Sequence, residues 1–331
     1  MPRRVLVFAC SCALGAGAWV VPATGHPARA ADAHVVGRGT PASCSSAAVV
    51  AAVAAGGAIR FDCGPRPVTI AMAATAKVVN TSRQIVLDGG GRVTLSGDGR
   101  RRILYMDTCD RAQMWTTSHC QDQASPQLIV RNMRFVDGNS TGELYDGGGG
   151  GAIFDRGGRL RIVNSVFSGN RCDPDGPDLG GGAVRALSQY DNLPVYVVRS
   201  RFTTNVCSNG GALSSIGVSW TVQGSRFVAN RAIGSGANPA RAGTPGGGSG
   251  GAIYNDGDQM TLSITATTFE RNHANEGGGA IFFVSDDRTG TMAIAHSTLD
   301  GNPNDGFQTP GLPGIYFLGA HRPAFTDTVD H

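Results

Sequence analysis

Lysine is almost missing from the chain, and charged residues of both signs are sparse. Lys77 is the single lysine, charged residues make up 16% of the 331 positions, and the formal net charge is +3. A lysine could therefore act as a catalytic base only at position 77. The composition gives no indication of a basic surface for nucleic acid or for a membrane, so we expect neither as a partner.

Short-spaced metal ligands are also scarce. No Cys-x-x-Cys pair occurs, and His119 beside Cys120 is the only histidine adjacent to a cysteine. Zinc sites need several such ligands at close spacing, so the cysteines are better explained by disulfides.

Long apolar runs are missing except at the amino terminus. Pro2-Arg3-Arg4 precedes an apolar stretch over 5–21, and small residues follow up to position 33. This order is typical of a secretory signal peptide, so we expect residues 1–33 to be removed and the chain to be secreted without stable membrane insertion. An uncleaved membrane anchor is the alternative, although the run is short and diluted by glycine.

Glycine, in contrast, is abundant and regularly placed. The tetrapeptide Gly-Gly-Ala-aliphatic begins at Gly150, Gly181, Gly210, Gly250 and Gly278. A second tetrapeptide, Phe-x-x-Asn, ends each repeat at Phe167–Asn170, Phe202–Asn205, Phe227–Asn230 and Phe269–Asn272, with Leu299–Asn302 as a degenerate copy. Alternating apolar residues between them, such as Leu160 and Ile162, have the period of a strand.

A strand repeat of this length predicts an all-β protein in which each coil buries its apolar face against its neighbours, a parallel β-helix. Paired glycines supply positive φ at a corner, and the small alanine fits a narrow interior. The repeated asparagines are expected to stack in a hydrogen-bonded column and to be structural.

The amino-terminal segment carries the signals of a short helix. Ser45-Ser46 precedes an alanine-valine run, and Gly56-Gly57 follows it. We expect this segment, about 44–57, to cap the first coil. Coils over about 58–320 and a tail over 321–331 then complete a single domain, 34–331.

The two tetrapeptides together resemble the repeats of the polymorphic outer membrane protein family, within the wider pectin-lyase-like β-helices. The resemblance covers about residues 130–320 and implies a single-stranded right-handed parallel β-helix. That superfamily includes adhesins, lyases and hydrolases, so the fold does not by itself assign a function. Gly-His-Gly and Arg-Ile-Lys, which would indicate catalytic sites, do not occur.

Six cysteines remain after the predicted signal peptide. Cys172 and Cys207 each lie five residues after the phenylalanine of their repeat, so they occupy equivalent positions on adjacent coils, within the reach of a disulfide. The pairs Cys44–Cys63 and Cys109–Cys120 follow as sequence neighbours.

Two polar segments have binding potential, one before a Gly-Gly-Ala tetrapeptide and one in the amino-terminal third. Asp173, Asp175 and Asp178 surround Gly176, an oxygen-rich arrangement that calcium prefers, although an ordinary acidic turn is the alternative. In the cysteine-closed loop 107–126, Trp115 and His119 could contact sugars, or could simply belong to a surface loop.

The segments after the Gly-Gly-Ala tetrapeptides supply the candidate site. The substrate-binding candidates are Asp155, Arg185, Tyr190, Asp191 and Tyr254. The catalytic candidates are Asp256, Asp258, Asp286, Asp287 and Arg288. A lyase needs a base and a cation or arginine, and a hydrolase needs two carboxylates, so these residue types suit either enzyme; hairpin turns are the alternative explanation.

These observations predict a secreted, monomeric, adhesin-like protein that binds a polysaccharide or a cell-surface glycan, with calcium as the one cofactor considered. The alternative is a polysaccharide lyase or glycoside hydrolase acting on an acidic polysaccharide. An enzyme should bring together two carboxylates, or a carboxylate and an arginine, with shifted pKa values, whereas a binding protein should present a flat ladder of aromatic and polar side chains.

Overall fold

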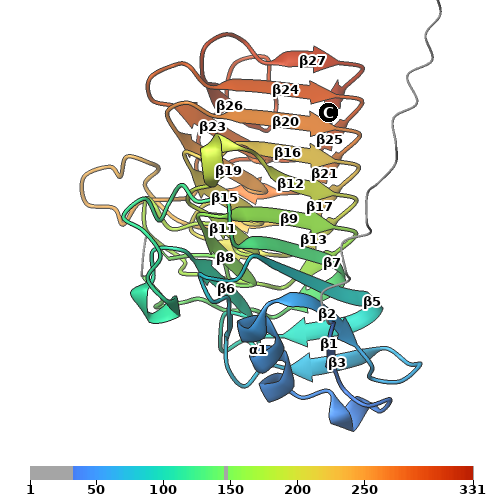
Figure 1. The fold of residues 1–331 in the computed structure, drawn as a ribbon. Coiled ribbons are helices and arrows are strands. Elements are labelled where there is room, and N and C mark those ends of the chain that lie inside the picture. Colours follow the sequence, from blue (N-terminus) through green and yellow to red (C-terminus); the bar gives the residue numbers. More distant parts are fainter. Residues whose placement is uncertain (1–32, 145–147, 331) are drawn as a thin grey trace, which may run out of the picture. The chain divides into compact units, whose positions relative to one another are not determined.

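The computed structural model describes residues 33–144 and 148–330, so nearly all of the predicted signal peptide, 1–33, lies outside the described residues. The described chain is all-β and consists mainly of three sheets of stacked strands (Figure 1). Every pairing between the named strands is parallel.

The strands of successive repeats lie side by side in each sheet. The eight-stranded sheet contains β4 (Ala76–Lys77), β6 (Leu104–Asp107), β8 (Ile153–Arg156), β11 (Val184–Ala186), β15 (Leu213–Ile216), β19 (Ile253–Gly257), β23 (Ile281–Ser285) and β26 (Ile315–Leu318). The three-stranded sheet contains β14 (Val206–Cys207), β18 (Arg231–Ala232) and β22 (His273–Ala274).

The largest sheet receives two strands from most repeats. Its members are β1 (His34–Val36), β2 (Gly57–Phe61), β3 (Val68–Ala71), β5 (Gln84–Ser96), β7 (Gln127–Val136), β9 (Arg159–Val163), β10 (Val166–Ser168), β12 (Val195–Val198), β13 (Arg201–Thr203), β16 (Trp220–Gln223), β17 (Arg226–Val228), β20 (Thr261–Thr265), β21 (Thr268–Glu270), β24 (Thr291–Ala295), β25 (Thr298–Asp300), β27 (Ala324–Thr326) and β28 (Val329–Asp330). A repeat such as β11–β14 therefore crosses all three sheets in turn.

Helical structure is short and lies mostly outside the repeats. The helix α1 spans Ser46–Ala55, where the sequence predicted a short helix, and it buries Val49, Ala52 and Val53. The Ser45 hydroxyl accepts a hydrogen bond from the Ala48 amide, and Gly56 follows the helix at a φ of 75°. Single 3₁₀ turns are η1 (Pro41–Ser43), η2 (Arg111–Gln113) and η4 (Tyr190–Asn192).

A column of stacked phenylalanines runs through the interior. Phe135, Phe167, Phe202, Phe227 and Phe269 are fully buried, with successive ring centroids 4.8–5.0 Å apart. This separation equals the spacing of paired strands, because each ring lies in register with the next one. The repeated phenylalanine is thus an element of the core.

A column of asparagines follows the same register, as expected. Asn170, Asn205, Asn230 and Asn272 are fully buried, and each side-chain amide donates to the Oδ1 atom of the next repeat's asparagine at 2.9 Å, ending at Asn302. Each amide also donates to the carbonyl of a repeat phenylalanine, for example Asn230 to Phe202 at 3.1 Å. Both amide protons are therefore satisfied without water.

A second column, of hydroxyl groups, was not expected. The Ser200 Oγ atom accepts from the Ser165 backbone amide, and the Ser225 Oγ atom accepts from the Ser200 amide, both at 3.1 Å. Thr267 and Ser297 continue the pattern. The residues just before these positions turn the chain with positive φ, for instance Arg199 at 47° and Ala266 at 50°.

The two glycines of each Gly-Gly-Ala tetrapeptide serve different purposes. Gly250, the first of its pair, has a φ of 71°, as the sequence indicated. Gly251, the second, is required for another reason, because an added Cβ atom would lie 2.0 Å from the Gly279 carbonyl oxygen. The alanine that follows, Ala252, is fully buried.

The structure contains the disulfides Cys44–Cys63, Cys109–Cys120 and Cys172–Cys207, which are the pairs expected from the sequence. The Cys172–Cys207 pair joins adjacent repeats, with Cα atoms 4.8 Å apart, next to the bridge between Arg171 and Val206.

Replacing Asn230 with alanine should lower the free energy of unfolding by about 2–4 kcal/mol, because it leaves buried donors and acceptors of Asn205, Asn272 and Phe202 without partners. Urea denaturation measures the change. Asn304→Ala is the matched control, since Asn304 lies outside the column and bonds only Gln308 through its side chain. Equal stability of the two variants would contradict a structural role for the asparagine column.

Candidate functional site

The eight-stranded sheet has two differently composed sides, because side chains alternate along each strand. Ile153, Val184 and Leu213 belong to the apolar core and face inward. The next residue of each strand faces the opposite side. These residues form one column, here called the outer column: Lys77, Tyr105, Phe154, Arg185, Ser214, Tyr254, Phe282 and Tyr316.

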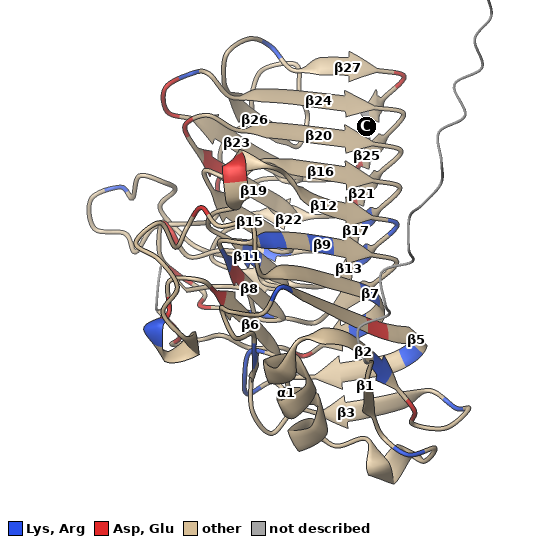
Figure 2. Ribbon diagram, in the orientation of Figure 1, with Lys and Arg blue, Asp and Glu red and all other residues tan. Residues whose placement is uncertain are grey.

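Loops that precede the Gly-Gly-Ala tetrapeptides cover much of the outer column. Glu143 and the Gly149 carbonyl bind Arg102, the Asp178 carbonyl accepts from Arg185, and Asn238 contacts Tyr254. Phe154, Arg185, Ser214 and Tyr254 are consequently fully buried. Figure 2 shows both signs of charge in the loops beside this sheet.

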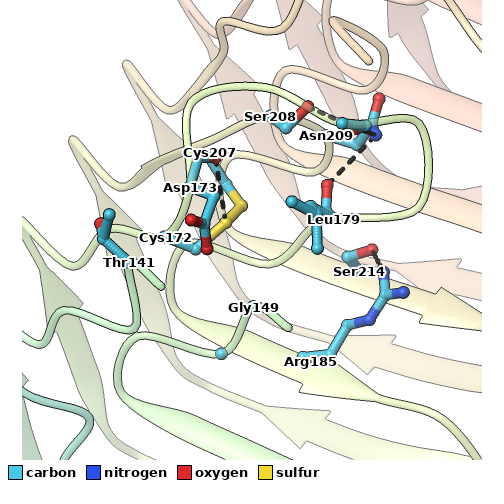
Figure 3. Close-up of a disulfide and its surroundings, with 12 residues drawn as sticks. Thr141, Gly149, Cys172, Asp173, Leu179, Arg185, Cys207, Ser208, Asn209 and Ser214 are labelled. Atoms are coloured by element: carbon cyan, nitrogen blue, oxygen red, sulfur yellow. Dashed lines mark hydrogen bonds between the residues drawn. A yellow bond between two sulfur atoms is a disulfide. The ribbon is translucent and has the colours of Figure 1, made fainter. Parts of the chain in front are cut away.

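Arg185 is the central residue of this buried layer (Figure 3). Its Nη1 atom donates to the Ser214 hydroxyl at 2.6 Å, and its Nε atom has no hydrogen-bond partner among the described residues. Burial lowers the pKa of the guanidinium to about 10, whereas electrostatic interactions with Tyr254, Asp178 and Asp256 act in the opposite direction. Its hydrogen bonds go to the Ser214 hydroxyl and the Asp178 carbonyl and to no carboxylate of a described residue. A buried cation without a paired carboxylate is energetically costly, so an anionic group would be stabilised beside it.

Tyr254 and Asp256 form a polar cluster at the border of this layer. The Tyr254 hydroxyl and the Asn238 amide both donate to the Asp256 Oδ2 atom, at 2.8 and 3.0 Å. Asp256 is half-buried, and burial raises its pKa above the ordinary value. The Asp286 carboxylate adds to this rise, whereas the Tyr254 hydrogen bond opposes it.

The cluster thus combines a carboxyl group with a raised pKa, a phenol, an amide and a nearby guanidinium. Burial also raises the pKa of Tyr254 well above its ordinary value, so the phenol stays neutral and donates a hydrogen bond to Asp256. Such a set can bind sugar hydroxyl groups and a sugar carboxylate. It also meets the requirement for a proton donor beside an anion-stabilising group.

The other catalytic candidates lie in turns near Asp256. Asp258, Asp286, Asp287 and Arg288 are exposed. The Asp287 Oδ1 atom accepts hydrogen bonds from the Thr289 amide and hydroxyl, which lower the pKa of Asp287. Asp287 is therefore bound within its own turn, whereas Asp286 contributes to the raised pKa of Asp256.

The substrate-binding candidates do not form one exposed edge. Arg185 and Tyr254 share the outer column but are covered, as described above. Tyr190 and Asp191 lie in the turn η4, where the Asp191 amide donates to the Asp122 carboxylate at 2.7 Å. They belong to a loop beside the sheet.

Asp155 lies on the inner side of β8, away from Arg185 and Tyr254. It is in register with Ala186 of β11, a core residue, and is fully buried. The Gln189 side chain donates to one carboxylate oxygen, and the other oxygen has no partner among the described residues. Burial raises the pKa of Asp155 well above its ordinary value, and the nearby Asp107 adds to the shift.

The expected calcium site is not formed. Within 33–144 and 148–330, no group of three His, Cys, Asp or Glu side chains could hold a metal ion. The Asp173 Oδ1 atom accepts from the Gly142 amide at 2.9 Å, Asp175 points to solvent, and Asp178 contributes its backbone carbonyl to Arg185. The acidic segment 173–178 is a covering turn.

In loop 107–126, Trp115 is half-exposed, and the Arg111 guanidinium lies 4.7 Å from the Trp115 ring centroid. His119 is exposed and makes only local contacts with Ser118 and Thr117. These contacts stabilise the loop surface and do not bring the two side chains into the outer column.

Two serines have the Gly-x-Ser-x-Gly spacing of a nucleophile turn, Ser140 and Ser249. Both are fully buried, and neither precedes a helix. The spacing therefore reflects glycine abundance.

Sequence reasoning missed the residues at the amino-terminal end of the outer column. Lys77 and Tyr105 are paired in register, and Arg102, Asp110 and Glu143 lie around them. The signal was available, since Tyr105 follows the inward-facing Leu104 by one position, as Phe154 follows Ile153.

Residues 266–284 match the repeat of the Chlamydia polymorphic membrane protein, a segment that contains one Phe-x-x-Asn and one Gly-Gly-Ala-Ile tetrapeptide. No curated protein and no solved structure matches the chain. Among the described residues, no helix has both the length and the apolar composition needed to cross a membrane.

Asp155→Asn should raise the free energy of unfolding at neutral pH. Because the folded-state pKa of Asp155 is raised, its contribution to stability is fully present below the ordinary value of 3.8 and is lost as the pH rises toward the folded-state pKa. The variant keeps a hydrogen-bond acceptor for Gln189. Its free energy of unfolding should exceed that of the wild type by a growing amount as the pH is raised from 4 to 8. Urea denaturation across this range measures the gain.

Asp175→Asn, at an exposed position, should follow the wild-type curve. An Asp155→Asn protein that is less stable than the wild type at neutral pH would show instead that the native fold requires the ionised carboxylate.

Proposed function

We propose that the protein is secreted and binds a polysaccharide or a cell-surface glycan at the Asp256 cluster, in the manner of an adhesin. The observation that carries this proposal is the hydrogen-bonded cluster of Asp256, Tyr254 and Asn238. The Arg185 guanidinium lies two strands away and interacts electrostatically with Asp256. Sugar hydroxyl groups need acceptors and donors in close alternation, and an acidic sugar also needs a cation. Three disulfides support an oxidising compartment, as expected for a secreted chain.

The proposal includes the finer architecture. The stacked parallel sheets would form one single-stranded right-handed β-helix of the pectin-lyase-like type over 34–331, acting as a monomer, after loss of the signal peptide 1–33. The helix α1 would cap it, since Val49 and Val53 pack with the core. A crystal structure with the opposite hand of winding would contradict this architecture.

The covering loops are consistent with binding at a border. Arg185 is closed off by the backbone at Gly180, where an added Cβ atom would lie 2.2 Å from the Ser214 hydroxyl. Asp256, in contrast, is only half-buried. A glycan would therefore contact Asp256 and Asn238 directly, with the charge of Arg185 acting from behind.

Asp256→Asn should weaken glycan binding by about tenfold, the change in Kd expected for loss of one charge-assisted hydrogen bond. A glycan array that includes acidic polysaccharides identifies a ligand, and titration of that ligand into both proteins measures the loss. The substitution keeps the size of the side chain and an acceptor for Tyr254, so folding should be preserved.

Asp287→Asn is the matched control, because Asp287 is bound within its own turn. Binding that is unchanged in the Asp256 variant, or reduced equally in both variants, would place the ligand elsewhere.

A polysaccharide lyase or glycoside hydrolase is the second candidate. The observation that favours it is the raised pKa of Asp256 near Asp286 and Arg185. Asp256 would then act as a general acid, and Arg185 would stabilise negative charge on the substrate.

If the protein is an enzyme, Asp256→Asn should lower kcat by about 100-fold or more. In the wild type, kcat should be constant at low pH and fall as the pH rises through the raised pKa of Asp256, since the acid form is then lost. Assays for unsaturated products and for new reducing ends on acidic polysaccharides measure both. If the protein binds acidic polysaccharides but cleaves none of them, the enzyme candidate is wrong and the adhesin-like function is retained.

A further inference from the structure

A separate cavity lies at the amino-terminal end of the outer column, away from Asp256 in the strand order. Its volume is about 250 Å³, and its walls are Thr75, Lys77, Arg102, Tyr105, Asp110 and Glu143. The cavity is small for a binding site, so only a ligand of roughly amino-acid or monosaccharide size would fit.

One ion pair in the cavity wall is already complete. The Arg102 Nη1 atom donates to Glu143 at 3.0 Å, and its Nε and Nη2 atoms donate to the carbonyls of Gly150 and Gly149 at 3.1 and 2.8 Å. The guanidinium is buried and also lies 5.0 Å from the Phe154 ring centroid. Arg102 therefore has a structural role, and the other oxygen of the cavity-lining Glu143, Oε1, has no hydrogen bond to a described residue.

Two further charges in the wall have no ionic partner among the described residues. The Lys77 ammonium lies 5.2 Å from the Tyr105 ring centroid. The Asp110 Oδ2 atom accepts from the Tyr105 hydroxyl at 3.2 Å, and its Oδ1 atom accepts from the Ala112 amide at 2.9 Å. One cation and one anion thus remain available to a ligand.

Tyr105 holds these two charges apart. Tyr105 is 5% exposed, and its ring stacks on Phe154 with centroids 5.5 Å apart. Lys77 lies over the ring face, whereas Asp110 lies at the hydroxyl end. Burial raises the pKa of the Tyr105 phenol, so the spacer between the two charges stays neutral.

We propose that this cavity binds a small zwitterion, with the ligand's carboxylate on Lys77 and its ammonium group on Asp110 and the free oxygen of Glu143. A simple anion would meet the Asp110 carboxylate, and a simple cation would meet Lys77, so each is disfavoured relative to a ligand that carries both charges. Free amino acids and amino sugar acids share this chemistry. The proposal does not rest on the glycan proposal for Asp256.

Calorimetric titration of the full chain distinguishes these ligands. The zwitterionic probes are the L-amino acids in one arm and muramic acid in the other. The matched probes with one charge removed are the N-acetylated amino acids, the amino acid amides, N-acetylmuramic acid and glucosamine. We expect at least one zwitterion to bind, and its single-charge analogues to bind at least tenfold more weakly.

Lys77→Met keeps the aliphatic contact with Tyr105 and removes the charge, and it should weaken binding of the zwitterion at least tenfold. Lys77 is exposed, so this variant should fold normally. Asp110→Asn should act similarly. Arg100→Met and Asp175→Asn, at exposed positions outside the cavity wall, are the matched controls and should bind as the wild type does.

Failure of every zwitterion to bind would overturn the proposal. So would equal binding by the acetylated analogues, or unchanged affinity in Lys77→Met. Each of these results leaves the Asp256 experiments unaffected, since Asp256 does not line this cavity.

Discussion

The register of parallel pairing is the constraint on which the rest of the structure depends. Phe167 pairs with Phe202, and Phe202 pairs with Phe227. Each repeat phenylalanine therefore lies one strand spacing from the next one, and the repeat asparagines are aligned in the same way. A slip by one residue in any repeat would turn its phenylalanine outward and its asparagine away from the column. The same backbone hydrogen bonds therefore hold all three columns in place: the stacked phenylalanines, the asparagines and the hydroxyl groups.

The fixed register also explains how loops of different length are accommodated. Between Asn230 and Gly250 the chain inserts the segment 233–249, yet β15 and β19 still pair residue by residue. The added residues leave the stack and cover the outer column, where Asn238 reaches Tyr254 and Arg241 forms a two-point ion pair with Glu276. The repeats thus support a second, irregular layer, and the candidate site lies where that layer ends.

Repetition determined what the sequence could predict. Phe-x-x-Asn recurs, so the buried asparagine column and the Cys172–Cys207 pair could be derived from spacing alone. The position of Asp155 could also have been derived, because it lies two residues after the inward-facing Ile153 whereas Arg185 lies one residue after Val184. The polar residues were grouped by segment, without counting the alternation of inward and outward side chains along each strand. All of these residues were therefore expected to lie along one exposed edge.

The covering of Arg185 and Tyr254 could not be derived in this way. It depends on loops 173–180 and 233–249, which occur once each and have no repeat to fix their path. The same reason applies to the predicted calcium site. The acidic residues of 173–178 have a suitable composition, but in the fold Asp178 binds Arg185 through its backbone carbonyl. The contacts of a loop that occurs only once are determined by the three-dimensional fold and cannot be derived from the repeat spacing.

The asparagine column has a direction as well as a position. From Asn170 to Asn272, every side-chain amide donates to the asparagine of the next higher-numbered repeat, and none donates to the asparagine of the lower-numbered repeat. Amide dipoles aligned head to tail polarise one another, so each added member strengthens those already present. The interior therefore has an electrical polarity that no formal charge reveals, and extension of the column by a further repeat would be energetically different at its two ends.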